Sequence, residues 1–309
     1  MANTYPGVLS CGCKVFAGWT YDNGLRDKHM STQGGTVPYH PHMPFHEYAA
    51  IKALNWSTIK HPTALAQRAA LSAGSDSDPL YSALHCALLE PGEFDARYTV
   101  SEGRRTAAAK AAAGDRILLT ERDDLAIRSV VEAVRSHPAA GPLLADCQGR
   151  AEVTLEWTER VAGQTWPMKG RLDALVIDGD TATIVDLKAV PRVSPRHVAV
   201  EIARRGYHGQ LAHYAAGVRA VWPDIRTVRA MIIAYEARAP YDVGVFELPC
   251  DEALYTGEVY RAERLCCYAS AALSGRWDGA CPDTVQVVLP RWAPGLATDD
   301  AGADYDEEV

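Results

Sequence analysis

Hydrophobic and polar residues follow two different periods along this chain, and the change of period locates its elements. In the first part, apolar positions recur at helical spacing, and Asp78-Pro79 is typical of a helix start: a capping side chain followed by proline. Between residues 151 and 188, apolar and polar residues alternate instead, as they do in strands. The pattern predicts helices over 79–90, 106–113 and 123–136, followed by a three-stranded antiparallel meander. The last helix is expected to turn Leu125, Val130, Val131 and Val134 inward.

The second half of the chain returns to the helical period before two further strands. The expected elements are helices over 195–205 and 206–222, strands over 228–236 and 241–248, and a long helix over 251–274. This order predicts an α/β domain: a central mixed β-sheet flanked by helices, with a mainly helical N-terminal part. We expect the domain to span 45–290, between an N-terminal extension of unknown role (1–44) and a disordered acidic tail (291–309).

Charge is distributed unevenly along the 309 residues. The net charge is −8, but residues 299–309 alone hold six acids and no base. Residues 189–229 hold seven arginines and only two acids, among them Arg192, Arg196, Arg204 and Arg205. Such a segment is either a face that contacts phosphates or a solvated helix face, and the charge pattern alone leaves both readings open.

The composition indicates a globular chain that does not enter a membrane. The chain is 48% hydrophobic, yet no apolar run approaches the roughly 20 residues that cross a bilayer. The first residues lack the basic start and apolar core of a secretory signal, so we expect a cytoplasmic protein. The eight cysteines have irregular spacing and no paired CxxC motif, which favours reduced thiols over a metal or cluster site.

Two aspartates and a lysine form the most informative pattern. Asp186 and Lys188 are two positions apart on a predicted strand, so their side chains share one face. Asp173 lies on the neighbouring strand, and a turn at 178–180 places it across the hairpin from Asp186. Two facing carboxylates repel each other unless a cation lies between them, and hard oxygen ligands suit Mg²⁺ or Mn²⁺. Together with the lysine, they provide the parts for metal-assisted phosphodiester hydrolysis. The alternative is a surface hairpin whose charges face water.

The same segment resembles the core of the PD-(D/E)xK nucleases, with Asp173 followed by Asp186-Leu187-Lys188. The flanking sequences are similar to the RecB-type branch, and most closely to the RecE-like exonucleases of phages and prophages. The resemblance runs from about Tyr48 to Trp222. Its motifs are 53–60 (ALNWSTIK), 83–91 (ALHCALLEP), 151–153 (AEV), 170–174 (GRLDA), 185–188 (VDLK) and 206–214 (GYHGQLAHY). Leu172 stands where the superfamily name has proline.

The resemblance assigns a role to each matching residue. It implies metal ligation by Asp173, Asp186, the carbonyl of Leu187 and His85, with Mg²⁺ as the cofactor and Mn²⁺ as an alternative. It implies that Lys188 orients or activates the attacking water. Gln210 and Tyr214 share a helix face with Tyr207, and this stripe is expected to contact substrate or brace the lysine. Further candidates for the substrate site are Arg196, Arg204 and Arg205, and Glu152 is an additional acidic candidate.

The resemblance further implies an enzyme that degrades linear double-stranded DNA from an end, 5′ to 3′, and leaves a 3′ single strand. The expected partners are DNA ends, further copies of the chain in a ring, and a single-strand annealing protein. Two alternatives stay open: an endonuclease, flap or single-strand nuclease with the same core, and a non-catalytic DNA-binding protein. An unrelated α/β enzyme is disfavoured because the sequence has neither a GxxxxGK nor a GxSxG motif.

Overall fold

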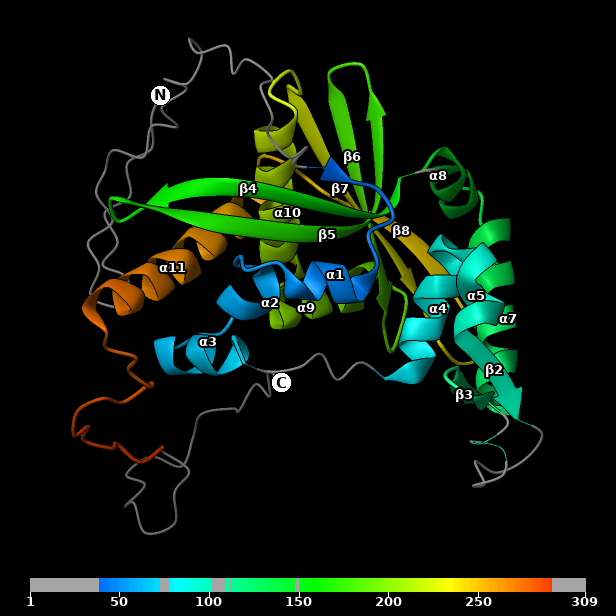
Figure 1. The fold of residues 1–309 in the computed structure, drawn as a ribbon, viewed down its shortest axis with the longest axis horizontal. Helices are drawn as coiled ribbons and strands as arrows, with labels where there is room; N and C mark the ends of the chain where they lie inside the picture. The colour runs from blue at the N-terminus through cyan, green and yellow to red at the C-terminus, as the bar shows by residue number, and fades with distance from the viewer. Residues whose placement is uncertain are drawn as a thin grey trace, which may run out of the picture.

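A six-stranded mixed sheet forms the centre of the molecule (Figure 1). The computed structural model describes residues 39–72, 78–101, 109, 111, 113–147 and 150–290. The strands lie in the order β1-β4-β5-β6-β7-β8. Their bounds are Tyr39–His40 (β1), Ala151–Val161 (β4), Gln164–Asp178 (β5), Thr181–Ala189 (β6), Thr227–Tyr235 (β7) and Val243–Leu248 (β8). The predicted α/β architecture with a central mixed sheet is therefore confirmed.

The strands β4, β5 and β6 form the predicted antiparallel meander. Its second hairpin pairs Ala174 with Val185 and Asp178 with Thr181, in the register that the sequence predicts. Strand β7 lies parallel to β6, and the crossover between them runs through two helices, as a parallel connection requires. These helices are α9 (Pro195–Arg205) and α10 (Tyr207–Val221).

Two of the remaining helices, α2 and α4, begin at a capping side chain. Asp78 accepts a hydrogen bond from the Leu80 amide at the start of α4, and Asn55 caps α2 in the same way. The bounds are Phe45–Ala50 (α1), Trp56–Ile59 (α2), Ala64–Ala70 (α3), Pro79–Leu89 (α4), Phe94–Arg97 (α5), Glu121–Ser136 (α7), Ala140–Asp146 (α8) and Ala253–Ser274 (α11). A 3₁₀ turn, η1 (Pro91–Glu93), and two short parallel strands, β2 (Tyr98–Ser101) and β3 (Ile117–Thr120), complete the fold.

Some expected segments lie outside the described residues. These are residues 1–38 of the extension, the tail from 291, and most of the helix expected over 106–113. The end of the extension is described, and there Tyr39 and His40 pair with the edge of β4.

Helices cover both faces of the sheet, so its strands are buried on either side. Neighbouring residues of β6 point to opposite sides: Ile184 packs in the cluster with α10 and α11, and Val185 in the cluster with α4 and α7. On α7, Val130 and Val134 face this second cluster as predicted, and Val131 is partly buried. The expectation for Leu125 is wrong: it is 61% exposed, because the helical period places it on the opposite side of α7 from Val134, and Ile127, which shares the side of Val130 and Val134, is buried instead. Among the described residues, none of the helices combines the length and hydropathy needed to cross a bilayer.

The close crossing of α10 and α11 gives a test of the packing. A Cβ atom at Gly257 would lie 2.2 Å from the carbonyl oxygen of His208, so the two helices meet backbone to backbone. We predict that Gly257→Ala lowers the free energy of unfolding by about 1–3 kcal/mol, because the added methyl overpacks a rigid contact. Gly92→Ala is the control, since a Cβ there would meet nothing within 4 Å. Urea titration of both variants measures the effect, and equal stability would contradict the crossing.

Candidate active site

Asp173 and Asp186 lie next to each other at the point where β5 and β6 stop pairing. Ala174 and Val185 are the paired residues farthest from the turn. Asp173 comes directly before Ala174 on β5, and Asp186 comes directly after Val185 on β6. The Oδ2 atom of Asp173 accepts a hydrogen bond from the Leu187 amide at 2.7 Å, so the carboxylate replaces the missing backbone pairing. The hairpin register thus places two acidic side chains at one position in the middle of the sheet.

Lys188 is the cation that accompanies them. Its Nζ atom lies 2.5 Å from Oδ2 of Asp186, and the Asp186 side chain is fully buried. The ammonium group also lies 4.6 Å from the ring centroid of Tyr207, close enough for a cation–π contact. The Oδ1 atom of Asp186 is buried and has no hydrogen-bond partner among the described residues. Because a buried carboxylate oxygen is costly to leave unsatisfied, this atom marks a place for a ligand.

Burial controls the protonation of this group. Burial raises the pKa of Asp186 to about 6, a shift that nearby Asp173 increases and Lys188 opposes. Burial also raises the pKa of Asp173. Burial alone would lower the pKa of Lys188, but the two carboxylates outweigh it and the pKa of Lys188 is raised overall. Lys188 is therefore an ammonium ion at neutral pH.

His85 approaches the aspartates from α4. Its Nδ1 atom is 3.7 Å from Oδ2 of Asp173, and the side chain is 29% exposed. Burial and the nearby Lys188 lower the pKa of His85, so the imidazole is neutral at pH 7. The end of α4 is held by Arg97, whose two terminal nitrogens contact the Glu90 carboxylate at 2.7 and 3.2 Å. This pair fixes the helix that presents His85.

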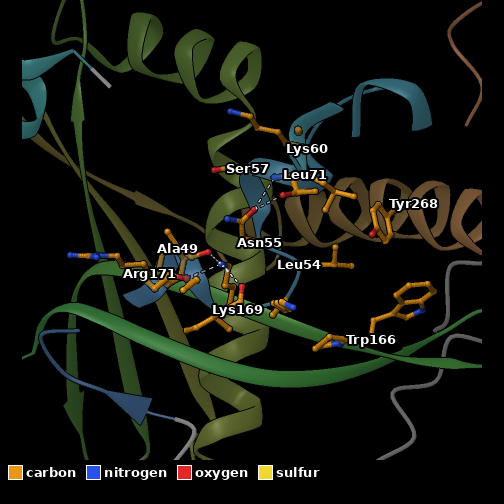
Figure 2. Close-up of a pocket in the computed structure, with 18 of the residues that line it drawn as sticks. Ala49, Leu54, Asn55, Ser57, Lys60, Leu71, Trp166, Lys169, Arg171 and Tyr268 are labelled. Carbon is orange, nitrogen blue, oxygen red and sulfur yellow. Dashed lines mark hydrogen bonds between the residues drawn. The ribbon is translucent and has the colours of Figure 1, made fainter. Parts of the chain in front are cut away.

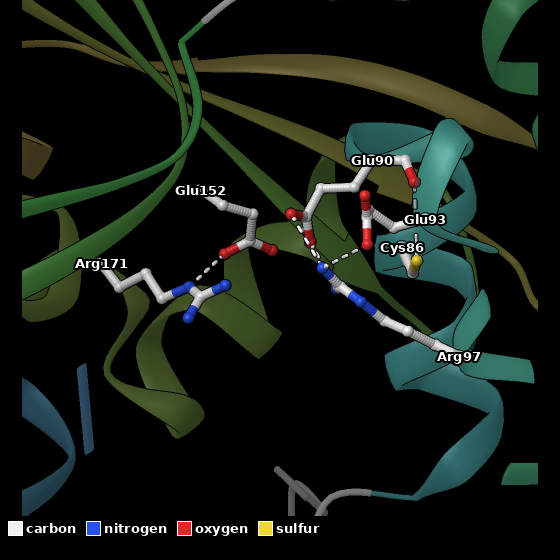
Figure 3. Close-up of polar contacts among 6 residues, drawn as sticks. All are labelled: Cys86, Glu90, Glu93, Arg97, Glu152 and Arg171. Carbon is white, nitrogen blue, oxygen red and sulfur yellow. Dashed lines mark hydrogen bonds and ion pairs between the residues drawn. The ribbon is translucent and has the colours of Figure 1, made fainter. Parts of the chain in front are cut away.

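Glu152 extends the acidic row onto a third strand. The pairs Ala151–Ala174 and Val153–Leu172 flank it, so it lies across from Asp173. Burial, and secondarily Asp173, raises the pKa of Glu152. The carboxylate forms an ion pair with Arg171 (Figure 3). The Glu152 backbone has a left-handed φ of 52°, which non-glycine residues rarely adopt. Such backbone strain is often found at functional sites.

Sequence reasoning missed Arg171 as a member of the site. The signal was present, because Arg171 is two positions before Asp173 and alternation places both on one face of β5. The left-handed conformation of Glu152 had no such signal.

The predicted substrate-binding residues divide into two groups. Tyr207 lies against Lys188, while Gln210 donates a hydrogen bond of 2.8 Å to the hydroxyl of buried Tyr214. The expected stripe therefore lies beside Lys188 and the two aspartates. The arginines Arg196, Arg204 and Arg205 are exposed on α9, and Arg205 is paired with Glu201. No contact among the described residues joins these arginines to Asp173 or Asp186.

The donor set fits a small hard cation held by few protein ligands. Within the described part of the chain, no group of three or more His, Cys, Asp or Glu side chains is arranged to hold a metal. Mg²⁺ needs fewer, because it commonly binds one or two carboxylates and keeps water or substrate phosphate in its other positions. Asp173, Asp186 with its unsatisfied oxygen, and the Leu187 carbonyl are the candidate ligands.

The sheet order, the buried acid pair and the adjacent lysine define a PD-(D/E)xK nuclease fold. The chain belongs to a family described as the PDDEXK-like domain of unknown function DUF3799, whose model matches residues 51–268. This assigns the superfamily and leaves the RecE-like subtype as a proposal.

One solved structure agrees with the fold. The chain is similar to a candidate exonuclease from Eubacterium rectale, with a TM-score of 0.51 and 13% identity over 74% of this chain and 83% of that one. At this identity the likeness bears on the fold alone. A second structure, of SSO0001, has a TM-score of 0.26 at 14% identity, covers 59% of this chain and 86% of that one, and carries no argument. No curated protein matches the chain.

The buried ion pair predicts a pH-dependent loss of stability. Lys188→Met removes the cation that lowers the pKa of Asp186. A carboxyl whose folded pKa is raised loses stability as pH rises from the unfolded value to the folded one. In EDTA, we expect the variant to lose about 3–5 kcal/mol at pH 8 and much less at pH 5, where Asp186 is mostly protonated.

The control is Arg128→Met, which removes an exposed partner of Asp124 on α7. Such surface pairs contribute about 0–1 kcal/mol, so its stability should change little at either pH. Urea unfolding at the two pH values makes the comparison. Equal losses for Lys188→Met at pH 5 and pH 8 would be incompatible with a buried, ionised Asp186.

Proposed function

We infer that this chain is a divalent-metal-dependent exodeoxyribonuclease that hydrolyses linear double-stranded DNA from its ends. The observation that carries the inference is the convergence of Asp173, Asp186 and Lys188 in one buried position. The DUF3799 match and the exonuclease-like neighbour support a nuclease. Direction 5′ to 3′, a ring-shaped homo-oligomer and an annealing partner rest on the RecE-like resemblance and complete the proposal.

The proposed metal is Mg²⁺, with Mn²⁺ as an alternative, held by Asp173, Asp186 and the Leu187 carbonyl, with His85 as a further candidate. When bound, such an ion supplies a Lewis acid for the phosphate and lowers the pKa of a bound water. The buried carboxylates bind it as anions, so the site works at a pH above the value of about 6 to which the pKa of Asp186 is raised.

Lys188 contributes as a charged hydrogen-bond donor rather than as a base. Its raised pKa keeps the ammonium group charged, so it donates hydrogen bonds to the attacking water or to a phosphate oxygen. Tyr207 limits its movement from one side and Asp186 from the other. His85 is neutral, so it adds no second positive charge that would bind the phosphate in competition with Lys188. One of its ring nitrogens faces Asp173, and its unprotonated nitrogen can accept a hydrogen bond.

The first test is a digestion assay with the wild-type chain. End-labelled linear duplex and covalently closed circular DNA are incubated with Mg²⁺ or with EDTA. We predict that only the linear substrate is degraded and that EDTA abolishes the reaction. A label on the 5′ end should be released before a label on the 3′ end. Asp186→Asn should reduce the rate by about 100-fold or more, because several kcal/mol of transition-state stabilisation are lost.

Other outcomes point to the alternatives. Cutting of the circle would indicate an endonuclease. DNA binding without any cleavage in Mg²⁺ or Mn²⁺ would indicate a non-catalytic binding protein.

Metal binding is tested separately by thermal unfolding. At pH 8, Mg²⁺ should stabilise the wild type, by about 2.7 kcal/mol when its concentration is roughly 100 times Kd. The gain should shrink below pH 6, because protons then compete for Asp186. Asp173→Asn and Asp186→Asn should lose the gain, and Glu132→Gln, an exposed carboxylate on α7, should keep it. Equal stabilisation of all four proteins would place the ion elsewhere.

A further inference from the structure

A groove of 930 Å³ leads away from the candidate active site. It lies between α1, α2, α3 and the first half of β5, with Tyr214 of α10 and Tyr268 of α11 in its lining. Figure 2 shows Arg171 at one end and Trp166 with Tyr268 at the other. Arg171 is two residues from Asp173 on the same strand and pairs with Glu152. The groove therefore begins where the acidic row ends.

The lining of the groove is positive in a chain that is acidic overall. The sequence has 39 acidic and 31 basic residues, yet among the described residues no aspartate or glutamate lines the groove, and Lys52, Lys60, Lys169 and Arg171 do. Within the described residues, neither Lys52 nor Lys60 forms an ion pair with a carboxylate. Uncompensated cations that share a concave surface attract a polyanion.

Lys60 extends this positive field to the catalytic lysine. Burial, followed by the charges of Lys188 and Arg205, lowers the pKa of Lys60, so the three cations lie near one another. Lys169 plays a different part: its buried ammonium donates to the carbonyls of Tyr48 and Ile51, both at 2.8 Å. Lys169 thus holds the backbone around α1 that forms one wall, and Lys52 and Lys60 remain available to a ligand.

Apolar and aromatic surface lies between these cations. Phe45 is 53% exposed and Leu71 is 49% exposed, although both belong to the wall of a groove. The Arg171 guanidinium lies 5.5 Å from the centroid of the Phe45 ring. At the far end, partly buried Trp166 packs edge-on against Tyr268. Flat apolar faces in the same groove as the unpaired Lys52 and Lys60 suit a ligand that exposes bases as well as phosphates, which a single strand does and a duplex does not.

The volume of the groove also suits a single strand. At 930 Å³ the groove is at the upper end of the roughly 300–1,000 Å³ found for small-molecule sites. Such a space takes a few nucleotides of one strand.

We propose that this groove binds a short segment of single-stranded nucleic acid that continues from the phosphate at the active site. The inference rests on the proposed nuclease function, which supplies the strand, but it assigns a separate binding surface. Lys52 and Lys60 contact phosphates, and Phe45 and Trp166 stack with bases.

The test measures binding of a short fluorescein-labelled oligothymidylate to the full chain in EDTA, by fluorescence anisotropy over a range of salt concentrations. Lys52→Gln/Lys60→Gln should weaken binding at least tenfold at low salt. It should also make the slope of log K against log[salt] shallower by about 1.4, which is about 0.7 for each lost phosphate contact. Phe45→Ala should weaken binding at least fivefold through lost stacking.

The matched control is Arg122→Gln/Arg128→Gln, which removes the same charge from exposed positions on α7, a helix that does not line the groove and lies apart from α2 and α3 in Figure 1. It should bind within about twofold of wild type. A second readout does not depend on affinity: an oligonucleotide containing 5-iodouracil should crosslink to Phe45 or Trp166. Circular dichroism confirms that each variant is folded.

The outcomes separate this inference from the nuclease proposal. The inference fails if the wild type does not bind oligothymidylate, if the lysine variant binds it like the control, or if only a blunt hairpin duplex is bound. DNA cleavage in Mg²⁺ with unaltered oligothymidylate binding by the groove variants would leave the nuclease proposal standing alone. Oligothymidylate binding that the groove variants weaken, without DNA cleavage in Mg²⁺, would support the groove and contradict the nuclease proposal.

Discussion

Burying two carboxylates side by side in the centre of a sheet is unfavourable unless a cation accompanies them, and the structure is arranged around that constraint. The register of β5 and β6 places Asp173 and Asp186 together where the ladder ends. The Leu187 amide and the Lys188 ammonium compensate part of the cost, and one oxygen of Asp186 stays unsatisfied. This unsatisfied oxygen therefore lowers the stability of the fold, and a bound ion and phosphate would restore that stability.

The elements around Asp173 and Asp186 are arranged to support these two side chains. Helix α4 is anchored through Glu90 and Arg97 and presents His85 to Asp173. The left-handed backbone of Glu152 accompanies its pairing with Arg171, so the third acid of the row is neutralised and not added to the first two. Arg171 in turn begins a groove whose lining, as far as the structure describes it, contains no acidic residue. The negative and positive parts of the site therefore lie in sequence along one strand, which suits a substrate whose phosphates run past a metal site.

Local signals predicted most of this fold. The turn at 178–180 fixed the hairpin register, because a tight turn leaves only one way to pair the strands on either side. The cap at Asp78 predicted where α4 begins. What local signals did not predict depends on distant contacts. Lys169 meets Tyr48 from more than a hundred residues away, so the groove wall formed by α1 leaves no trace in either segment alone. Leu125 is a different case, because the helical period alone places it on the opposite side of α7 from Val134, so its exposure follows from a local signal that the prediction did not use.

The central claim is that a divalent cation binds between Asp173 and Asp186, and its most direct test is crystallographic. Crystals of the wild-type chain grown with Mn²⁺, and data collected near the manganese absorption edge, would locate the ion by its anomalous signal. The account predicts a peak in contact with both carboxylates and the Leu187 carbonyl, and no such peak in Asp186→Asn crystals. A wild-type map with manganese bound elsewhere and none at these carboxylates would contradict it.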